Sequence, residues 1–439
     1  MVEFWLHRAA SKRITVRTGM AWQCWQQRGS ALPAVLLAIL VLSLLGAGFL
    51  SLSLVERQGA ANEVKITQAT YLAEAGINLA LARLRRDPGW REGLGEIYLT
   101  PAKGRITSVS VVPQAASYRL RSEGEIDGVR RAIEVDLARP FFSYALASAG
   151  DITIKNPLTI NGDLFATGSI YLQKGASGNV AAGVDLTIQN NTTVQGSVVT
   201  GRYLYNYGTI RGDATVGQTT DKYGNDPNYY GRVNGQVIKG LSFSFPNWPG
   251  DLAAPYTGGE PLPAGEYTLA MLQELVDSAP AGDNDIKILY CPGDLIIESG
   301  KGKGNDPDFY TGKAIIAAAG DITLGKDIRV TTGSDAWAFV AGNDILLDGG
   351  VTVDAVLMSN GYFYKQGAAS TINGSLVTGG LTEVDEDDGG DNKSSKDNSR
   401  GNIKGPLTIN AQDNRIQVLS PVLAATGWQV LSWRGASLY

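Results

Sequence analysis

An uninterrupted apolar run near the N-terminus dominates the hydrophobic pattern. No residue from Gly29 to Val55 carries a formal charge, and Leu, Ala and Val prevail. A helix needs about 20 such residues to cross a bilayer, so the pattern predicts a transmembrane helix over 30–55. The apolar core is longer than that of a cleaved secretory signal.

The flanking charges predict an orientation. Residues 1–29 form a basic leader with five Lys or Arg and one Glu. This bias places the N-terminus in the cytoplasm and the bulk of the chain outside. The sequence does not decide between a start at Met1 and one at Met20.

The helical pattern continues beyond the apolar run, over 56–86. One mostly apolar stripe at 3–4 spacing comprises Ala61, Val64, Gln68, Leu72, Ala75, Leu79 and Ala82. Asp87-Pro88-Gly89 then ends the helix. We therefore expect one helical segment over 30–88, transmembrane first and amphipathic afterwards.

Short strands follow the helix. The segment 105–112 alternates, and Ser117–Ile126 and Val129–Leu137 flank Asp127-Gly128, a strong hairpin signal. We predict a small β-hairpin head over 89–140.

From Phe141 onward, short apolar strings recur between Gly and Asn/Asp. Ala149–Thr153 returns as Ala319–Thr323, and Leu158–Asn161 returns as Leu407–Asn410. Irregular repeats of this kind are typical of a parallel β-helix, in which coils stack to bury a shared core. A β-sandwich is the alternative. The predicted fold class is α+β, mostly β.

Several segments subdivide this region. We expect a first solenoid part over 141–240, a Pro-rich insertion over 241–285 with a short helix at Thr268–Asp277, and a second solenoid part over 286–439. Residues 383–402 read as a polar, acidic loop. Trp428 and Trp433 lie in alternating sequence that predicts a final coil or cap.

The N-terminal motifs carry a family resemblance. They are the Arg28-Gly29-Ser30 junction, Ser51–Glu56 at the membrane exit, Ala61-Asn62, and the Gln68–Gly76 block. Residues 28–86 resemble the N-terminal domain of PilX-type minor pilins of type IV pili. The resemblance implies cleavage by a prepilin peptidase between Gly29 and Ser30 and N-methylation of Ser30. It also implies a family helix motif of Gln68, Tyr71, Glu74 and Gly76.

One departure from the major pilins bears on the role. Major pilins carry Glu at the fifth position after cleavage, where this chain has Ala34. The resemblance then implies a minor or tip component. Its partners would be other pilins or pseudopilins, the prepilin peptidase and the lipid bilayer.

The remaining chemistry is sparse. The single His, His7, lies in the leader, and of the two Cys only Cys291 lies in the body, in a run that predicts a buried apolar role. We predict no enzyme, no cofactor and no metal. The net charge of −5 argues against nucleic acid as a partner.

An acidic cluster leaves an enzyme as an alternative. Asp321, Asp344 and Asp348 could share a groove, as in β-helix enzymes that act on polysaccharides. We favour the interpretation that these Asp residues cap coil corners, since Asp after Gly recurs at repeat boundaries.

Two further features are candidate binding sites. Oxygen-rich loops at 224–230 and 304–310 and the run 385–391 could attract Ca²⁺. We favour turns for the two Asn-Asp-Pro loops and a solvated acidic loop for the run. A patch of Tyr203, Tyr205, Tyr207, Tyr229 and Tyr230 could contact a surface glycan or protein, although one sheet face is the simpler interpretation.

The sequence thus predicts a minor pilin-like structural subunit. It would be a single-pass protein of the cytoplasmic membrane that enters an extracellular type IV pilus or pseudopilus, for assembly or for surface display and adhesion. The alternatives are a K-type pseudopilin of type II secretion, a membrane-anchored β-helix polysaccharide enzyme and a permanently anchored adhesin or scaffold.

Overall fold

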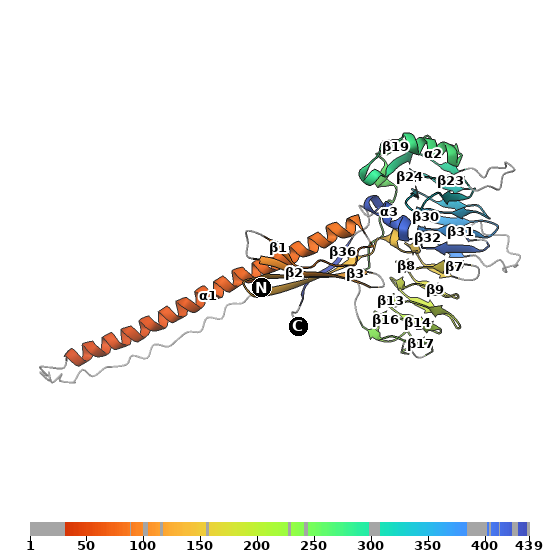
Figure 1. Ribbon diagram of the computed structural model, residues 1–439. Helices are drawn as coiled ribbons and strands as arrows, with labels where there is room; N and C mark the ends of the chain where they lie inside the picture. Colours follow the sequence, from red (N-terminus) through yellow and green to blue (C-terminus); the bar gives the residue numbers. More distant parts are fainter. Residues whose placement is uncertain are drawn as a thin grey trace, which may run out of the picture. The chain divides into compact units, whose positions relative to one another are not determined.

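The chain forms one long helix, an antiparallel sheet and a large array of parallel strands (Figure 1). The computed structural model describes residues 31–87, 89–99, 104–114, 117–154, 158–226, 230–240, 245–297, 308–383, 402–403, 405–411, 413–423 and 429–436. It divides into two units, Met1–Val64 and Lys65–Tyr439, which are considered separately. The predicted class, α+β and mostly β, is confirmed.

An antiparallel sheet forms the head of the second unit. Its strands, in spatial order, are β1 (Ile97–Leu99), β2 (Gly104–Pro113), β3 (Ser117–Ile126), β4 (Val129–Ala138) and β36 (Val430–Ala436). Asp127 and Gly128 link β3 to β4 with φ of 46° and 79°. Two consecutive positive φ values match the right-handed twist of the flanking strands, so the predicted hairpin is confirmed.

The helix α1 (Ala31–Arg86) packs its C-terminal part on this sheet. The buried stripe comprises Ala69, Ala73, Ile77, Ala80 and Leu84. The stripe expected from the sequence is wrong, because Gln68 and Leu79 on it are exposed. The helix packs on the sheet through the face with the small side chains, because these bring the helix closer to the sheet than Leu would.

Glycines make this close approach possible. A Cβ on Gly124 of β3 would overlap the Ala69 carbonyl oxygen and lie 2.6 Å from the Ala73 nitrogen. On the helix, a Cβ on Gly76 would overlap the Ser122 hydroxyl and lie 3.0 Å from a Val109 methyl group. Both positions therefore require a residue without a side chain.

The parallel strands form a solenoid with three faces. The first face, which we call the covered face, runs through β19 (Glu260–Pro261), β21 (Lys287–Cys291), β24 (Lys313–Ala318), β27 (Ala336–Ala341), β30 (Val356–Lys365), β32 (Ser375–Gly380), β5 (Leu146–Ser148), β8 (Leu164–Ala166), β10 (Val180–Ala182), β13 (Val198–Thr200), β16 (Ala214–Val216) and β18 (Val237–Lys239). All these pairings are parallel.

The other two faces follow the same order. One comprises β20 (Gly265–Tyr267), β22 (Leu295–Ile297), β25 (Ile322–Leu324), β28 (Ile345–Leu347), the end of β30, β34 (Asn402–Ile403), β33 (Thr382–Glu383), β6 (Ile152–Ile154), β9 (Ile170–Leu172), β11 (Leu186–Ile188) and β14 (Leu204–Asn206). The last comprises β23 (Asp308–Tyr310), β26 (Ile328–Val330), β29 (Thr352–Val353), β31 (Ser370–Asn373), β35 (Leu407–Asn410), β7 (Leu158–Asn161), β12 (Thr193–Val194), β15 (Thr209–Ile210) and β17 (Arg232–Val233). Inward-facing Ile, Leu and Val of all three faces form one continuous core.

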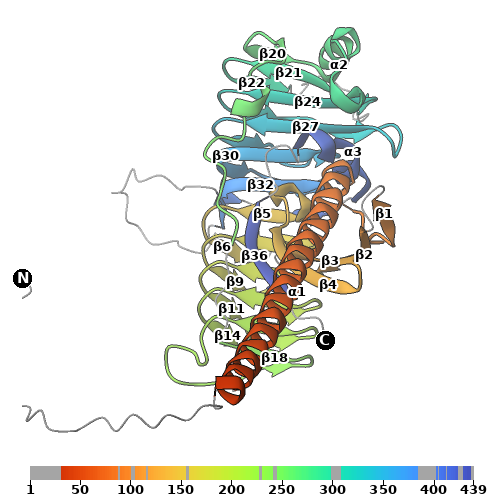
Figure 2. The same cartoon turned by 90° about the vertical axis from the view of Figure 1, so that its left-hand side faces the viewer.

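The chain enters this solenoid in the middle. The first arm, residues 146–239, winds from β5 to β18 at one end of the stack (Figure 2). The second arm, residues 260–410, begins at the opposite end with β19 and winds back until β32 pairs with β5. Spatial order and sequence order therefore differ.

A crossing segment and a helix cover the face that joins the arms. Residues 245–259 connect the two ends, with the short helix η2 (Ala254–Tyr256), and α3 (Asp413–Leu423) lies beside the short helix η1 (Phe141–Ser143). Leu252, Tyr256, Leu419 and Phe142 belong to one buried cluster with outward side chains of the covered face, such as Phe165. Asn360 fixes the crossing segment, since its side-chain oxygen accepts from the Leu252 nitrogen at 2.7 Å.

Two segments differ from the predicted organisation. The region 241–285 contains the predicted helix, α2 (Leu269–Ser278), capped by Thr268. However, β19 and β20 pair with β21 and β22, so this region opens the second arm rather than interrupting a single one. The C-terminal strand β36, expected in a solenoid cap, pairs with β4 in the head. Alternation of apolar and polar residues predicts a strand but does not identify the strand with which it pairs. Trp428 lies outside the described residues.

Substitution of Gly124 tests the helix–sheet contact. We expect Gly124→Ala to lower the stability of the head by about 1–3 kcal/mol, because the new methyl group meets helix backbone that cannot rotate away. Thermal unfolding of the full chain in micelles measures the loss. Gly95→Ala is the matched control, since nothing lies within 4 Å of a Cβ there; equal effects of the two substitutions would contradict the close packing.

Candidate assembly helix and surface sites

The N-terminal part of α1 forms an apolar surface. Among the described residues, α1 is the one helix long and apolar enough to cross a membrane. Its large apolar side chains from Leu32 to Val55 are exposed in the first unit. The hydroxyls of Ser43 and Ser51 donate to the carbonyls of Ile39 and Ala47, each at 2.7 Å. These two hydroxyls are thus satisfied inside the helix, as a bilayer requires.

The family helix motif divides between two environments. Gly76 is buried against the head sheet, and Glu74 is half-buried. Gln68 and Tyr71 are exposed, with 63% of Tyr71 accessible. Gly76 is therefore required for packing within the subunit, whereas Gln68 and Tyr71 lie on a surface available to a neighbour. Gly29 and Ser30, the predicted processing site, lie outside the described residues.

The suspected catalytic carboxylates hold the backbone together. The structure brings Asp321 and Asp344 to successive coils, where the Asp344 nitrogen donates to Asp321 Oδ1 at 3.1 Å. Asp344 Oδ1 in turn accepts from the Tyr362 nitrogen at 2.6 Å. Asp348 is not linked to either carboxylate by a described hydrogen bond. The corner interpretation thus accounts for Asp321 and Asp344, and the absence of enzymatic activity stays a prediction.

A similar ladder follows a corner of the first arm. Oxygens of Asp163, Asn179 and Ser197 each accept from the backbone nitrogen at the next coil, at 2.7, 2.8 and 3.0 Å. Asp, Asn and Ser alternate freely there because each offers one acceptor oxygen. The residues at these corners are therefore explained by the need for a hydrogen-bond acceptor and not by a role in catalysis.

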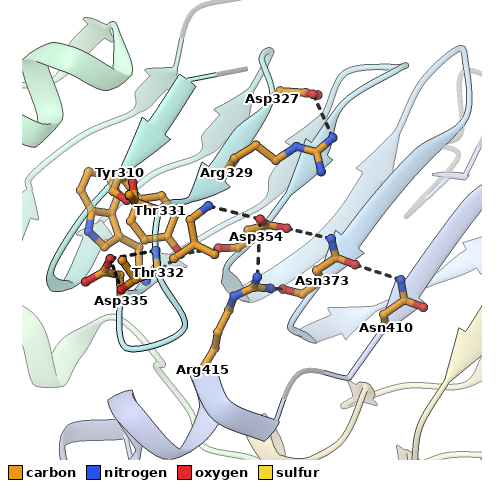
Figure 3. A network of polar contacts seen from close by, with 12 residues as sticks. Tyr310, Asp327, Arg329, Thr331, Thr332, Asp335, Asp354, Asn373, Asn410 and Arg415 are labelled. Atoms are coloured by element: carbon orange, nitrogen blue, oxygen red, sulfur yellow. Dashed lines mark hydrogen bonds and ion pairs between the residues drawn. The ribbon is translucent and has the colours of Figure 1, made fainter. Parts of the chain in front are cut away.

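A buried ion pair in the last face was not predicted. Asp354 Oδ2 accepts from the Val330 nitrogen at 3.2 Å and lies 3.5 Å from Arg415 Nη2 of α3 (Figure 3). Asp354 Oδ1 accepts from the Asn373 amide at 2.7 Å, and Asn410 donates to Asn373 at 2.9 Å. The ladder continues to Asn161 of the first arm at 2.7 Å. No spacing in the sequence relates Arg415 to Asp354.

A second buried pair joins the head to the solenoid. Arg139, which follows β4, pairs with Asp163, and its guanidinium lies 4.5 Å from the Tyr144 ring centre. Burial lowers the pKa of Arg139, but the nearby phenol groups of Tyr144 and Tyr118 and the Asp163 carboxylate raise this pKa above its ordinary value. Tyr118, Arg139 and Asp163 border a pocket of about 650 Å³ between β2, β3 and the first arm. The sequence offered no signal for this pair either.

The candidate metal loops have other partners where they are described. The described residues contain no cluster of three or more His, Cys, Asp or Glu suited to a metal ion. Asp221 Oδ1 accepts from the nitrogens of Tyr223 and Asn225 at 2.8 Å, and Asp226 pairs with Lys239. Residues 227–229, 304–307 and 385–391 lie outside the described residues.

Cys291 and the Tyr patch follow the sequence-based interpretation in part. Cys291 is fully buried in the core, as predicted, and burial raises the pKa of its thiol. Tyr203, Tyr205 and Tyr207 occupy one face around β14, as expected, and remain half-exposed. Tyr229 lies outside the described residues.

Comparisons with known proteins give a likeness to solved structures alone. No protein-family model matches the sequence, and no curated protein matches it. Among solved structures, the competence-associated pilin ComZ from Thermus thermophilus is similar at 14% identity and a TM-score of 0.32, over 85% of this chain and 97% of that one. A likeness with this TM-score assigns neither a fold nor a function to the chain.

Substitution of Asp344 tests its role at the corner. Burial, followed by the nearby Asp321 charge, raises the pKa of Asp344 above its ordinary value. Ionisation of the Asp344 carboxyl therefore costs more in the folded than in the unfolded state. The free energy of unfolding falls as the pH rises from the pKa of the unfolded state, about 3.9, through the higher pKa of the folded state. We expect Asp344→Asn, which keeps an acceptor for the Tyr362 nitrogen, to raise the melting temperature at pH 7 and to lose that advantage near pH 4.

Asp344→Ala is the matched control. It removes the acceptor and should lower the melting temperature across this range. Destabilisation of similar size by Asn and Ala at pH 7 would contradict the proposed electrostatic cost.

Proposed function

We propose that this protein is a minor pilin-like subunit of a type IV pilus or a related pseudopilus, and that it displays the solenoid for assembly or surface contact. The observation that carries the proposal is the division of α1 into two kinds of surface. The segment 32–55 exposes only apolar and small or hydroxyl side chains, whereas the segment 69–84 buries small residues against an antiparallel sheet.

Such a helix is suited first to a lipid bilayer and later to the interior of a filament. The exposed apolar part suits a lipid bilayer and suits equally the packed helices of a filament, because both replace water by hydrocarbon. In the second unit, the helix residues Tyr71 and Leu79 are also exposed. We infer that these residues contact neighbouring pilins or pseudopilins.

The topology supports display rather than burial of the solenoid. The solenoid is inserted between β4 and β36, so the head sheet remains continuous beneath the helix. The basic leader favours an N-terminus in the cytoplasm and a head and solenoid outside. The use of Asp321 and Asp344 as backbone acceptors supports a structural role over catalysis.

Processing of the leader provides the first test. Co-expression with a prepilin peptidase should yield a mature chain that begins at Ser30 with a methylated amine, as read by N-terminal sequencing and mass spectrometry. Gly29→Trp should leave the leader attached, because a bulky side chain obstructs cleavage after a small residue. Ala21→Trp, eight residues upstream and present with either start, should be processed normally. An intact N-terminus in the unaltered protein would refute the pilin assignment.

Copy number provides the second test. Ala34 has no carboxylate to pair with the amine of a neighbouring subunit, an attraction that is strong at low dielectric. We expect the protein to be a trace component of purified filaments by quantitative mass spectrometry. Ala34→Glu should raise its share, whereas Ala38→Glu, one turn further along the helix, should not.

The composition of purified filaments also shows whether this subunit can form a filament by itself. Fibres assembled from the unaltered subunit alone would contradict a low-copy role.

A further inference from the structure

A row of tyrosines marks the outer face of the first arm. Tyr203, Tyr205 and Tyr207 alternate along β14 and its flanks, with Leu204 and Asn206 buried between them. The rings of Tyr203 and Tyr205 lie 6.0 Å apart, and those of Tyr207 and Tyr230 lie 5.3 Å apart. Four residue steps of about 3.3 Å give the Tyr203–Tyr207 row a length of ~13 Å. We call Tyr203, Tyr205, Tyr207 and Tyr230 the tyrosine row.

The row lies where its sheet ends. β14 pairs with β11 on one side, and no further strand of this sheet pairs with its other side among the described residues. Outward positions in register run from Tyr171 through Thr187 to Tyr205. Aromatic rings and hydroxyls thus alternate across the coils, on a face that the crossing segment and α3 leave uncovered.

Charges border the row but largely cancel. Arg202, 5.3 Å from the Tyr203 ring centre, makes two bonds to Asp185 at 2.9 and 2.6 Å. The Lys222 ammonium lies 4.9 Å from the Tyr223 ring centre and 6.0 Å from that of Tyr205. Residues 185–239 contain five Lys or Arg and four Asp, so the surface is close to neutral.

We propose that the tyrosine row binds an extended glycan. The C–H face of a pyranose ring is apolar and flat, and it stacks on an aromatic ring while the sugar hydroxyls reach polar groups beside it. Tilted rings at 5.3 and 6.0 Å, with Thr187 and the Arg202–Asp185 pair alongside, offer both kinds of contact for consecutive sugar units.

Other macromolecules suit the surface less well. Single-stranded nucleic acid also stacks on aromatic rings, but it needs a groove with a strong excess of positive charge, and Asp185 offsets Arg202 here. A stable protein partner would need a desolvated interface core within a contact of about 800 Å² on each side. Between residues 141 and 240, the described large apolar side chains that are exposed are Tyr223, Tyr230 and Ile238.

The test uses the full chain in nanodiscs, whose phospholipids carry no sugar headgroup. The probes are cellohexaose, maltohexaose, chitohexaose and hexagalacturonate, with a thymidine 20-mer as the nucleic-acid probe. Saturation-transfer NMR detects binding, and titration gives the Kd. We expect at least one hexasaccharide to bind and the thymidine 20-mer not to.

Variants locate the site and separate stacking from hydrogen bonding. Tyr205→Ala should weaken binding by about tenfold, the loss of one stacked ring, whereas Tyr205→Phe should leave the Kd nearly unchanged. Tyr98→Ala, an exposed tyrosine of the head, is the matched control and should have no effect. If Tyr205→Ala fails to fold, Tyr230→Ala, at a 57% exposed position, replaces it.

Three outcomes would overturn the proposal. They are no binding of any hexasaccharide at millimolar concentration, binding unaffected by the row variants, and preferential binding of the thymidine 20-mer. Because the leader and α1 are unchanged in the row variants, loss of glycan binding leaves processing and filament entry intact. Failure of this proposal is therefore distinguishable from failure of the proposed pilin role.

Discussion

The register between the two solenoid arms is the constraint on which the structure depends. Because the chain enters the stack in the middle, both arms share one core only if β35 lies on β7 and β32 lies on β5. Leu407–Asn410 pairs residue for residue with Leu158–Asn161, an identical sequence. The side chain of Asn161 donates to that of Asn410 at 2.7 Å. A shift of one residue would turn Leu and Ile outward and separate the asparagines.

This junction also determines how the head is completed. The solenoid leaves the head after β4 and returns through α3 to β36, so Val135 pairs with Trp433 across 433 − 135 = 298 residues. Such a non-local pairing forms only once its two segments are brought together, and the stacked arms do this. Arg415 of α3 is held by Asp354 of the second arm, which places the start of the returning chain. Head completion therefore follows from solenoid closure.

Local chemistry was predictable from the sequence, and long-range order was not. The Asp127-Gly128 turn and the Gly-Asp corners each use a residue for its own backbone preference, which can be read without a partner. The repeat of Leu158–Asn161 at Leu407–Asn410 was visible, yet nothing indicated that the two copies are neighbours. The buried stripe on α1 was missed because Ala69, Ala73 and Gly76 are small. They allow the helix to approach the sheet closely, which a pattern of large apolar residues does not reveal. Asp354 and Arg415 meet only through the fold, as do Arg139 and Asp163.

Two chain connections, one after β4 and one before β36, attach the solenoid to the antiparallel sheet of the head. β4 ends at Ala138 and β36 begins at Val430, and the Ala138 nitrogen donates to the Gln429 carbonyl at 2.8 Å. Both links therefore leave from the same end of two adjacent strands. The Arg139–Asp163 pair adds a side-chain link between the head and the solenoid at that same end.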